Sequence, residues 1–234
     1  MKISSKDNPV IKYLTKLYES KKERDLSNSF IVEGYNLVGE AYKAGIVKSI
    51  YLVKEEKDYP DAVIITYDLL KKITDTITPE GIIAVCEKKL KSQLGDKILY
   101  LDRLQDPGNV GTLLRSALAF NFDTIILDES VDLYNPKTIR SSQGSIFNLN
   151  FINKSIDELK ALGYTIIGTE MFGIPLNEYK KTTDKIVLIL GNEGNGVRKE
   201  YLDSSDINLT ITMNKMESLN VGVAGAILMY ELNK

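Results

Sequence analysis

Hydrophobic residues near the N-terminus recur with the period of a helix, and further on they gather into short apolar runs. Over residues 9–24 the apolar side chains fall on one helical face, which predicts an amphipathic helix. The runs that follow have the length typical of strands, and helical stretches separate several of them. They cover residues 30–32, 50–53, 63–65 and 81–86. Residues 1–90 are therefore predicted to form a small α/β domain.

A polar stretch at residues 91–96 indicates a linker, and a second series of apolar runs follows it. The runs cover residues 98–101, 124–127, 164–168, 186–190 and 209–213. They are almost continuously apolar and alternate with predicted helices at about 111–120 and at 219–232, a pattern that favours a parallel sheet covered on both faces. We therefore expect residues 97–234 to form a larger α/β domain.

Ligands of open α/β sheets bind beyond the carboxyl ends of the strands. The loops after Leu101, Leu190 and Met213 are therefore the places to look for functional residues.

The composition removes several kinds of chemistry. The chain has one cysteine, Cys86, and no histidine, so zinc sites, haem ligation and triad hydrolases lack their usual side chains, and we expect no metal. The polar N-terminus does not resemble a signal peptide, and the apolar run at 221–230 is too short to cross a bilayer. We expect a soluble cytoplasmic protein without a membrane partner.

Charge alone does not indicate a nucleic-acid binder, because the net charge is only −2. The first 24 residues differ from this average, with seven basic and three acidic side chains. A basic helix can contact phosphates, and the candidates are Lys12, Lys16, Lys22 and Arg24. The alternative is an ordinary solvated helix face.

The loop after Leu101 leads into a predicted helix that carries an arginine. Its Pro107–Gly108 pair is typical of a type II turn, and Asn109 suits a helix N-cap. Arg115 lies outside the apolar arc of the helix, among the small residues Thr112, Ser116 and Ala119. An arginine near a helix N-terminus can hold a phosphate or a ribose oxygen. A surface salt bridge is the alternative.

The two remaining loops differ from known phosphate-binding motifs. Residues 190–198 contain three glycines, but their spacing fits neither a P-loop nor a dinucleotide fingerprint. Glu193 lies within this loop at the expected ligand edge, although the loop could be a mere connection. In the third loop Ser218 suits the N-cap of the last helix. That helix is apolar nearly all round, and its glycines and alanines would allow close packing, as at a subunit interface.

Taken in order, the three loops resemble the motifs of the SpoU/TrmH family of RNA 2′-O-ribose methyltransferases. NVGTLLR (109–115) is similar to the first motif, LILGNEGNGV (188–197) to the second and ITMNKMESLNVGVAGAILMYE (211–231) to the third. RSSQGSIFNLNF (140–151) resembles the family's segment between motifs one and two. Residues 8–41 resemble the family's substrate-binding domain, which is related to ribosomal protein L30e.

This resemblance implies a parallel-sheet catalytic domain with a C-terminal trefoil knot, preceded by the smaller L30e-like RNA-binding domain. It also implies a homodimer whose active sites are completed across the interface. The cofactor would be S-adenosylmethionine, held largely by backbone groups. By position in the motifs, the cofactor-binding residues are Leu190, Gly191, Ile211, Met213, Leu219 and Asn220.

The resemblance further implies attack of a ribose 2′-hydroxyl on a sulfonium methyl group. It places Arg115 at the 2′-hydroxyl; because arginine stays protonated, we expect it to orient a phosphate and to stabilise developing alkoxide charge. Asn109 would support the substrate or Arg115, and Glu193 would orient Arg115 or Asn109. Ser218 and Asn220 would complete the site.

Four functions remain open at this stage. The favoured one is 2′-O-methylation of RNA, with 23S ribosomal RNA of the large subunit as the substrate. A tRNA methyltransferase is the alternative within the same class. The others are a non-catalytic RNA-binding or ribosome-assembly relative and a nucleotide-dependent oxidoreductase, which would lack its glycine fingerprint. Binding of S-adenosylmethionine, of a dinucleotide or of neither separates the enzymes from the binding protein.

Overall fold

The computed structural model describes residues 2–74, 76–89, 92–216 and 218–234, which form two compact units. The first unit comprises residues 1–89 together with 132–147, and the second comprises 90–131 together with 148–234. The expected second domain, 97–234, is thus interrupted by residues 132–147, which pack with the first unit. Residues 1, 75 and 90 of the expected first domain and residue 91 of the expected linker lie outside the described residues.

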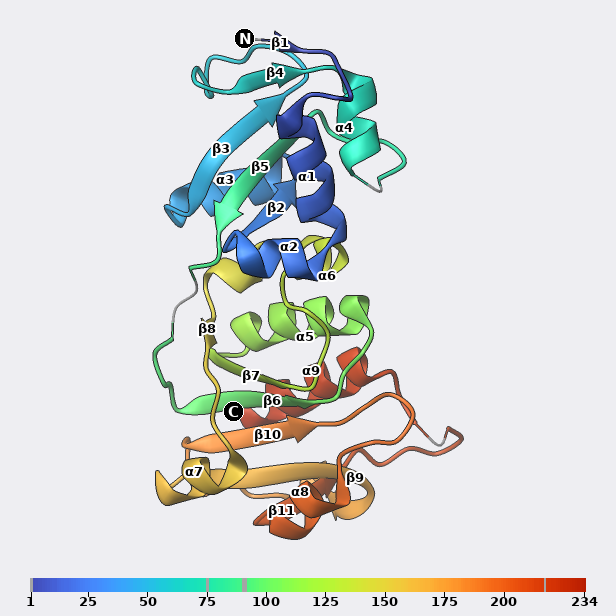
Figure 1. Cartoon of the computed structure of the whole chain (residues 1–234). Coiled ribbons are helices and arrows are strands. Elements are labelled where there is room, and N and C mark those ends of the chain that lie inside the picture. Colours follow the sequence, from blue (N-terminus) through green and yellow to red (C-terminus); the bar gives the residue numbers. More distant parts are fainter. Residues whose placement is uncertain (1, 75, 90–91, 217) are drawn as a thin grey trace. The chain divides into compact units, whose positions relative to one another are not determined.

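The first unit contains a mixed sheet with the strand order β1-β4-β3-β5-β2 (Figure 1). Strand β5 runs antiparallel to both of its neighbours, whereas β3, β4 and β1 are parallel. The strands are β1 (Lys2–Ile3), β2 (Ser29–Glu33), β3 (Val47–Leu52), β4 (Val63–Ile65) and β5 (Ile82–Glu87).

Helices of the first unit bury the apolar side chains that the sequence pattern picked out. The helices are α1 (Pro9–Glu19), α2 (Lys21–Leu26), α3 (Tyr35–Lys43), α4 (Tyr67–Ile73) and α6 (Pro136–Ser142), and a 3₁₀ turn, η1, covers Ser145–Phe147. Ile11, Leu14 and Leu17 of α1 join one core cluster with Leu70 and Ile73 of α4. The single helix expected over 9–24 is two helices, because Ser20 is extended and its hydroxyl accepts the Glu23 N–H at the start of α2.

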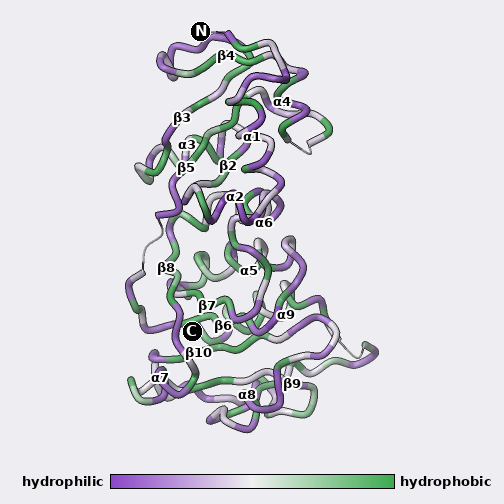
Figure 2. Tube along the Cα trace, viewed as in Figure 1, coloured by the Kyte–Doolittle hydropathy of each residue, from purple (hydrophilic) through white to green (hydrophobic). Residues whose placement is uncertain are grey.

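The second unit is built on a sheet whose strand pairs are all parallel, in the order β11-β9-β10-β6-β7-β8. This confirms the predicted α/β fold with a parallel sheet. Strands β6, β7 and β10 are hydrophobic along most of their length (Figure 2), as strands buried on both faces are. The strands are β6 (Lys97–Asp102), β7 (Thr124–Asp128), β8 (Asn150–Phe151), β9 (Thr165–Pro175), β10 (Ile186–Leu190) and β11 (Ile207–Thr210).

Helices cover both faces of the second sheet, with α5 and α9 on one side and α7 and α8 on the other (Figure 1). They are α5 (Pro107–Ala119), α7 (Ile156–Ala161), α8 (Lys199–Ser204) and α9 (Val221–Leu232), with a 3₁₀ turn, η2, at Leu176–Glu178. Helix α9 packs closely on α5, since a Cβ added at Gly222 would lie 3.2 Å from Thr112 Cγ2 and one at Gly225 would collide with Leu113. These glycines, expected at a subunit interface, therefore pack within the chain. Among the described residues no helix combines the length and the apolar content that a bilayer crossing requires.

Candidate active site

Helix α5 begins earlier than the sequence pattern predicted, and this places Asn109 in its first turn. Asp106 is the N-cap, and its Oδ1 accepts the Asn109 N–H at 2.8 Å. Pro107 at the first helical position has the fixed φ that a helix start needs. The predicted turn at 107–108 and the predicted N-cap at Asn109 are therefore wrong, and the side chain of Asn109 is left free for other partners.

The glycine-rich loop after β10 presents Glu193 to Asn109. Asn192 and Gly196 pair through two backbone hydrogen bonds of 3.1 and 2.8 Å, which fold the loop back on itself. Gly191 must lack a Cβ because that atom would collide with the Val197 nitrogen. At the exposed tip, Glu193 Oε1 accepts a hydrogen bond from Asn109 Nδ2 at 3.1 Å.

Asn220 brings the third motif to the same amide. Its Oδ1 accepts the Gly222 N–H at 2.9 Å and so caps α9, which begins at Val221 rather than at 219. Asn220, and not Ser218, is therefore the N-cap. Its Nδ2 donates to Asn109 Oδ1 at 2.9 Å. The amide of Asn109 thus joins one polar side chain from each of the other two motifs.

Arg115 and Ser218 are exposed and make no hydrogen bond to this cluster of described side chains. In the part of the chain that the structure describes, Arg115 has no hydrogen bond or ion pair, so the surface salt bridge considered as its alternative role is not formed there. Ser218 likewise has no hydrogen-bond partner among the described residues. The guanidinium of Arg115 remains open to a ligand.

The candidate cofactor residues lie around the same edge of the sheet. Leu190 and Gly191 are buried at the end of β10, and Leu190 Cδ1 lies 2.6 Å from a Cβ built on Gly225 of α9. Strand β11 ends at Thr210, so Ile211 and Met213 lie in the segment after it rather than in the expected strand. Leu219 is 38% exposed. Across 211–216 and 218–219 the backbone makes no hydrogen bond to another described residue. Free N–H and C=O groups beside apolar side chains suit a ligand with both polar and apolar parts.

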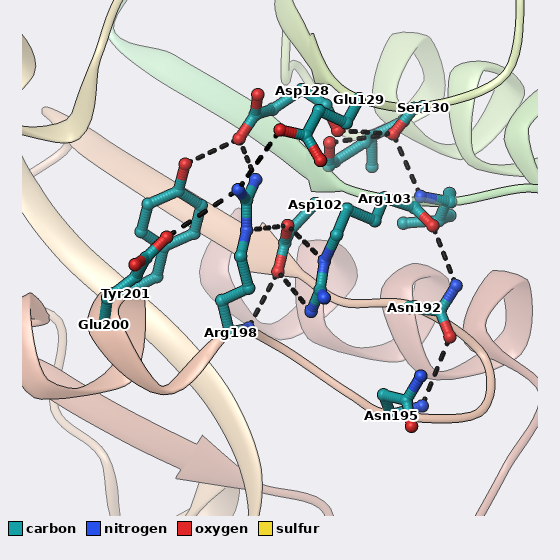
Figure 3. Close-up of polar contacts among 12 residues, drawn as sticks. Asp102, Arg103, Asp128, Glu129, Ser130, Asn192, Asn195, Arg198, Glu200 and Tyr201 are labelled. Atoms are coloured by element: carbon teal, nitrogen blue, oxygen red, sulfur yellow. Dashed lines mark hydrogen bonds and ion pairs between the residues drawn. The ribbon is translucent and has the colours of Figure 1, made fainter.

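A network of charged side chains around the buried Asp102, behind the loop, was missed by the sequence analysis (Figure 3). Asp102, the last residue of β6, is fully buried and accepts hydrogen bonds from the Arg198 N–H at 2.8 Å and from Arg198 Nε at 2.6 Å. Arg198 also pairs with Asp128, which ends β7 and accepts from Tyr201 Oη at 2.6 Å. Paired carboxylates at the ends of adjacent strands were the available signal, because buried charges require partners.

The tyrosines of this network act as donors. Burial raises the pKa of Tyr100 and that of Tyr201 above the ordinary tyrosine value. Both hydroxyls therefore keep their protons at neutral pH and donate to Asp128, from Tyr100 at 3.1 Å.

The candidate RNA-contacting cations of the first unit divide into two groups. Lys12, Lys16 and Lys22 are exposed, and Lys12 lies 3.4 Å from Asp7. The side chain of Arg24 is only 4% exposed, and its guanidinium bonds to Asp132 at 2.8 Å and to the carbonyl oxygens of helix α1. Arg24 is thus committed to the interior of the first unit, and we remove it from the set of candidate phosphate contacts.

Comparison with known proteins identifies the family. Residues 96–230 match the SpoU rRNA methylase family, and residues 8–84 match the MRM3-like substrate binding domain. The chain is 41% identical to the 23S rRNA (guanosine(2553)-2′-O)-methyltransferase RlmP of Bacillus subtilis, with 98% of each chain covered.

Two solved structures agree with this assignment. The AdoMet-bound rRNA methyltransferase of Sinorhizobium meliloti is 26% identical, with 99% of this chain and 97% of that chain covered and a TM-score of 0.87. A structure of an RNA 2′-O ribose methyltransferase is 28% identical, with 99% and 98% covered and a TM-score of 0.84. The family match spans more than half of the chain and includes all three loops of the site. This chain belongs to the SpoU rRNA methylase family.

Proposed function

We propose that this protein transfers a methyl group from S-adenosylmethionine to a ribose 2′-hydroxyl of 23S ribosomal RNA. The observation that carries the proposal is the amide of Asn109, which joins Glu193 at 3.1 Å and Asn220 at 2.9 Å. Family membership and full-length similarity to an rRNA guanosine 2′-O-methyltransferase support the substrate class. By the same similarity, the modified nucleoside is a guanosine.

The cofactor fits the open backbone segment and the apolar residues around it. Leu190 and Gly191 would hold it from β10, Ile211 and Met213 from the segment after β11, and Leu219 with Asn220 from the start of α9. When bound, S-adenosylmethionine supplies an activated methyl group on a sulfonium. The chain's apolar side chains exclude water around it, and its free N–H and C=O groups supply specific hydrogen bonds.

The protein's polar residues position the RNA. Arg115 is exposed, unpaired among the described residues and always protonated, so it orients a phosphate and stabilises negative charge on the ribose oxygen rather than removing a proton. Glu193 and Asn220 fix which end of the Asn109 amide is N–H and which is carbonyl. Asn109 can then present its remaining N–H and lone pair to the substrate in a defined direction. Ser218 adds a hydroxyl to the same site.

The active protein is proposed to be a homodimer that completes each site across the interface. Val223, Ile227 and Tyr230 of α9 are 49%, 37% and 52% exposed, and at this spacing they follow one face of the helix. An exposed apolar stripe marks a surface that a partner covers. Arg115, exposed and unpaired in the described chain, would then meet the substrate of the partner's site.

The trefoil knot stays a prediction from the family resemblance. Domain 1–90 would bind RNA, with Lys12, Lys16 and Lys22 on the phosphates; its match to a substrate-binding family supports this. The protein would act in the cytoplasm, where ribosomal RNA is found, without a metal.

Methyl transfer from labelled S-adenosylmethionine to total RNA of a strain lacking the gene tests the function. The purified protein, Arg115→Ala and the control Lys160→Ala, which lies on α7 at the other face of the sheet, are compared. We expect label in 23S RNA at alkali-resistant linkages, lost with Arg115→Ala and kept with Lys160→Ala. Label in tRNA would instead favour the tRNA enzyme, and absence of cofactor binding would favour a non-catalytic RNA-binding protein.

A further inference from the structure

We infer that Arg198, together with Asp102, is a positioning residue that holds the 191–197 loop so that Glu193 meets Asn109. The inference rests on the proposed function, since the position of Glu193 matters only if that site transfers a methyl group. Both ends of the loop are attached to the same place, the end of strand β6 (Figure 3).

The C-terminal end of the loop is attached through charge. Arg198 directly follows Val197 and makes two hydrogen bonds to Asp102, one from its backbone N–H at 2.8 Å and one from Nε at 2.6 Å. Asp102 is fully buried on a central strand, so it is a fixed anchor. Hydrogen bonds between ionised groups are roughly twice as strong as neutral ones, which makes this the firmer of the two attachments.

The N-terminal end of the loop is attached through an amide. Asn192 Nδ2 donates to the Arg103 carbonyl oxygen at 2.8 Å, and Asn192 Oδ1 accepts the Gly194 N–H at 2.9 Å and the Asn195 N–H at 3.2 Å. One side chain thus ties the loop to β6 and shapes its turn. Glu193 is held between these two attachments.

The tip itself is weakly held. Glu193 is exposed, and its contacts to Asn109 and to the Asp106 N–H are 3.1 and 3.4 Å long. The 3.4 Å contact is longer than an ordinary N–H···O hydrogen bond, and water competes for an exposed carboxylate, so these two contacts alone hold the tip loosely. A displacement of about 1 Å can lower a rate about 100-fold, so the anchors behind the loop govern the alignment of the site.

Arg198→Ala removes the side-chain anchor while leaving the fold supported. Asp102 keeps Arg103, whose Nε lies 3.1 Å away, and the backbone N–H at position 198. Asp128 keeps both tyrosine hydroxyls. Arg198→Lys retains the charge and should recover part of the function. The matched control is Glu200→Gln, because the exposed Glu200 pairs with Arg198 only at 3.7 Å and makes no hydrogen bond or ion pair to residues 191–197 among the described residues.

The test combines hydrogen exchange of the loop with steady-state kinetics. In Arg198→Ala we expect faster hydrogen exchange of amides 193–196 and a kcat lowered by at least tenfold. The dissociation constant for S-adenosylmethionine should change less than threefold. Arg198→Lys should recover part of the lost kcat. If Arg198 acts through Glu193, adding Arg198→Ala to the Glu193→Gln variant should lower the kcat of that variant by less than twofold. Glu200→Gln should match the wild type in every readout.

Two results in Arg198→Ala would overturn the positioning role: unchanged hydrogen exchange of amides 193–196, or faster exchange of these amides with an unchanged kcat. Independent effects of Arg198→Ala and Glu193→Gln overturn action through Glu193. If the wild type binds S-adenosylmethionine but methylates no RNA or ribosomal particle, the proposed function is wrong, and exchange still decides whether Arg198 holds the loop.

Discussion

Asn220 donates a hydrogen bond of 2.9 Å to Asn109, a residue 111 positions away in the sequence, and the two lie at the starts of helices α9 and α5. The same Asn220 accepts the Gly222 N–H through Oδ1. A carboxamide can do both, whereas an ionised carboxylate only accepts and a methyl group does neither. One side chain thus couples the stability of a helix to the arrangement of the site.

Two substitutions of Asn220 should separate these roles. Asn220→Asp keeps the capping oxygen, so the free energy of unfolding should change by less than about 0.5 kcal/mol, while loss of the donor to Asn109 should lower methyl transfer at least about tenfold. Asn220→Ala should lose activity and also about 1 kcal/mol of stability. Urea unfolding and methyl transfer are measured together. Full activity of Asn220→Asp would show that the Asn109 bond is not needed.

Gly225 should be among the least replaceable residues of α9. A Cβ there would collide with Leu113 and lie 2.6 Å from Leu190 Cδ1, so Gly225→Ala must push the helix from the sheet at a cost of about 1–3 kcal/mol. Because Leu190 is a proposed cofactor contact, affinity for S-adenosylmethionine should fall as well. The control is Gly39→Ala in α3, where no atom lies within 4 Å and helix propensity predicts stabilisation of about 0.5–1 kcal/mol. Thermal unfolding and isothermal calorimetry measure both effects.

Arg24 should stabilise the fold of the first unit rather than bind RNA. Its side chain and that of Asp132 are 4% and 13% exposed, so Arg24→Ala leaves a carboxylate buried without its partner. We expect a loss of about 3–5 kcal/mol, measured by urea unfolding. Lys22→Ala, at an exposed position of the same helix, should change stability by less than about 0.5 kcal/mol. Equal stability of the two variants would contradict the buried ion pair.

The thiol of Cys86 should be unreactive in the folded protein. It is fully buried in β5, and burial raises its pKa to about 12 from an ordinary value of 9.0. The folded state therefore holds this proton to higher pH than the unfolded chain. Its contribution to stability is complete below pH 9.0 and is lost as pH rises towards about 12. Iodoacetamide at pH 8 should label the protein only in denaturant; rapid labelling of the native protein would contradict this burial.

The parts of the fold that could be predicted are those with a strong local pattern. Strands β6, β7 and β10 are almost continuously apolar, so their existence and the parallel sheet followed from periodicity. Helix starts were harder, because neighbouring residues could each act as caps. Asp106 caps α5 where Asn109 was expected, and Asn220 caps α9 where Ser218 was expected. Composition cannot choose between two good capping residues.

The long-range features could not be predicted from local patterns. Residues 132–147 pack with the first unit through contacts such as Arg24 with Asp132, which are 108 positions apart. The charge of Arg24 was visible in the sequence, but its burial was not. The charged network around Asp102 was missed for the same reason, since Asp102 and Arg198 are 96 positions apart. The polar site residues came from the order of three motifs, and the structure brings Asn109, Glu193 and Asn220 together.

The proposed homodimer makes the sharpest prediction about the surface of the second unit. Ile227 lies between Val223 and Tyr230 in the exposed stripe of α9, so Ile227→Glu would bury a charge in any interface formed there. Because Ile227 is already 37% exposed in the chain alone, the substitution should leave the protomer folded. Light scattering after size exclusion should show a dimer for the wild type and a monomer for the variant.

Loss of the dimer should also remove activity if Arg115 serves the partner's site. The control is Leu162→Glu, at a 43% exposed position after α7 on the other face of the sheet, which should remain dimeric and active. Mixing Arg115→Ala with Glu193→Gln then tests shared sites directly. Mixed dimers in which one site receives the intact Arg115 and the intact Glu193 should recover up to about half of the wild-type rate per mixed dimer, because one of their two sites is whole. Absence of recovery in mixed dimers whose formation has been verified, or a fully active Ile227→Glu monomer, would place the whole site within one chain.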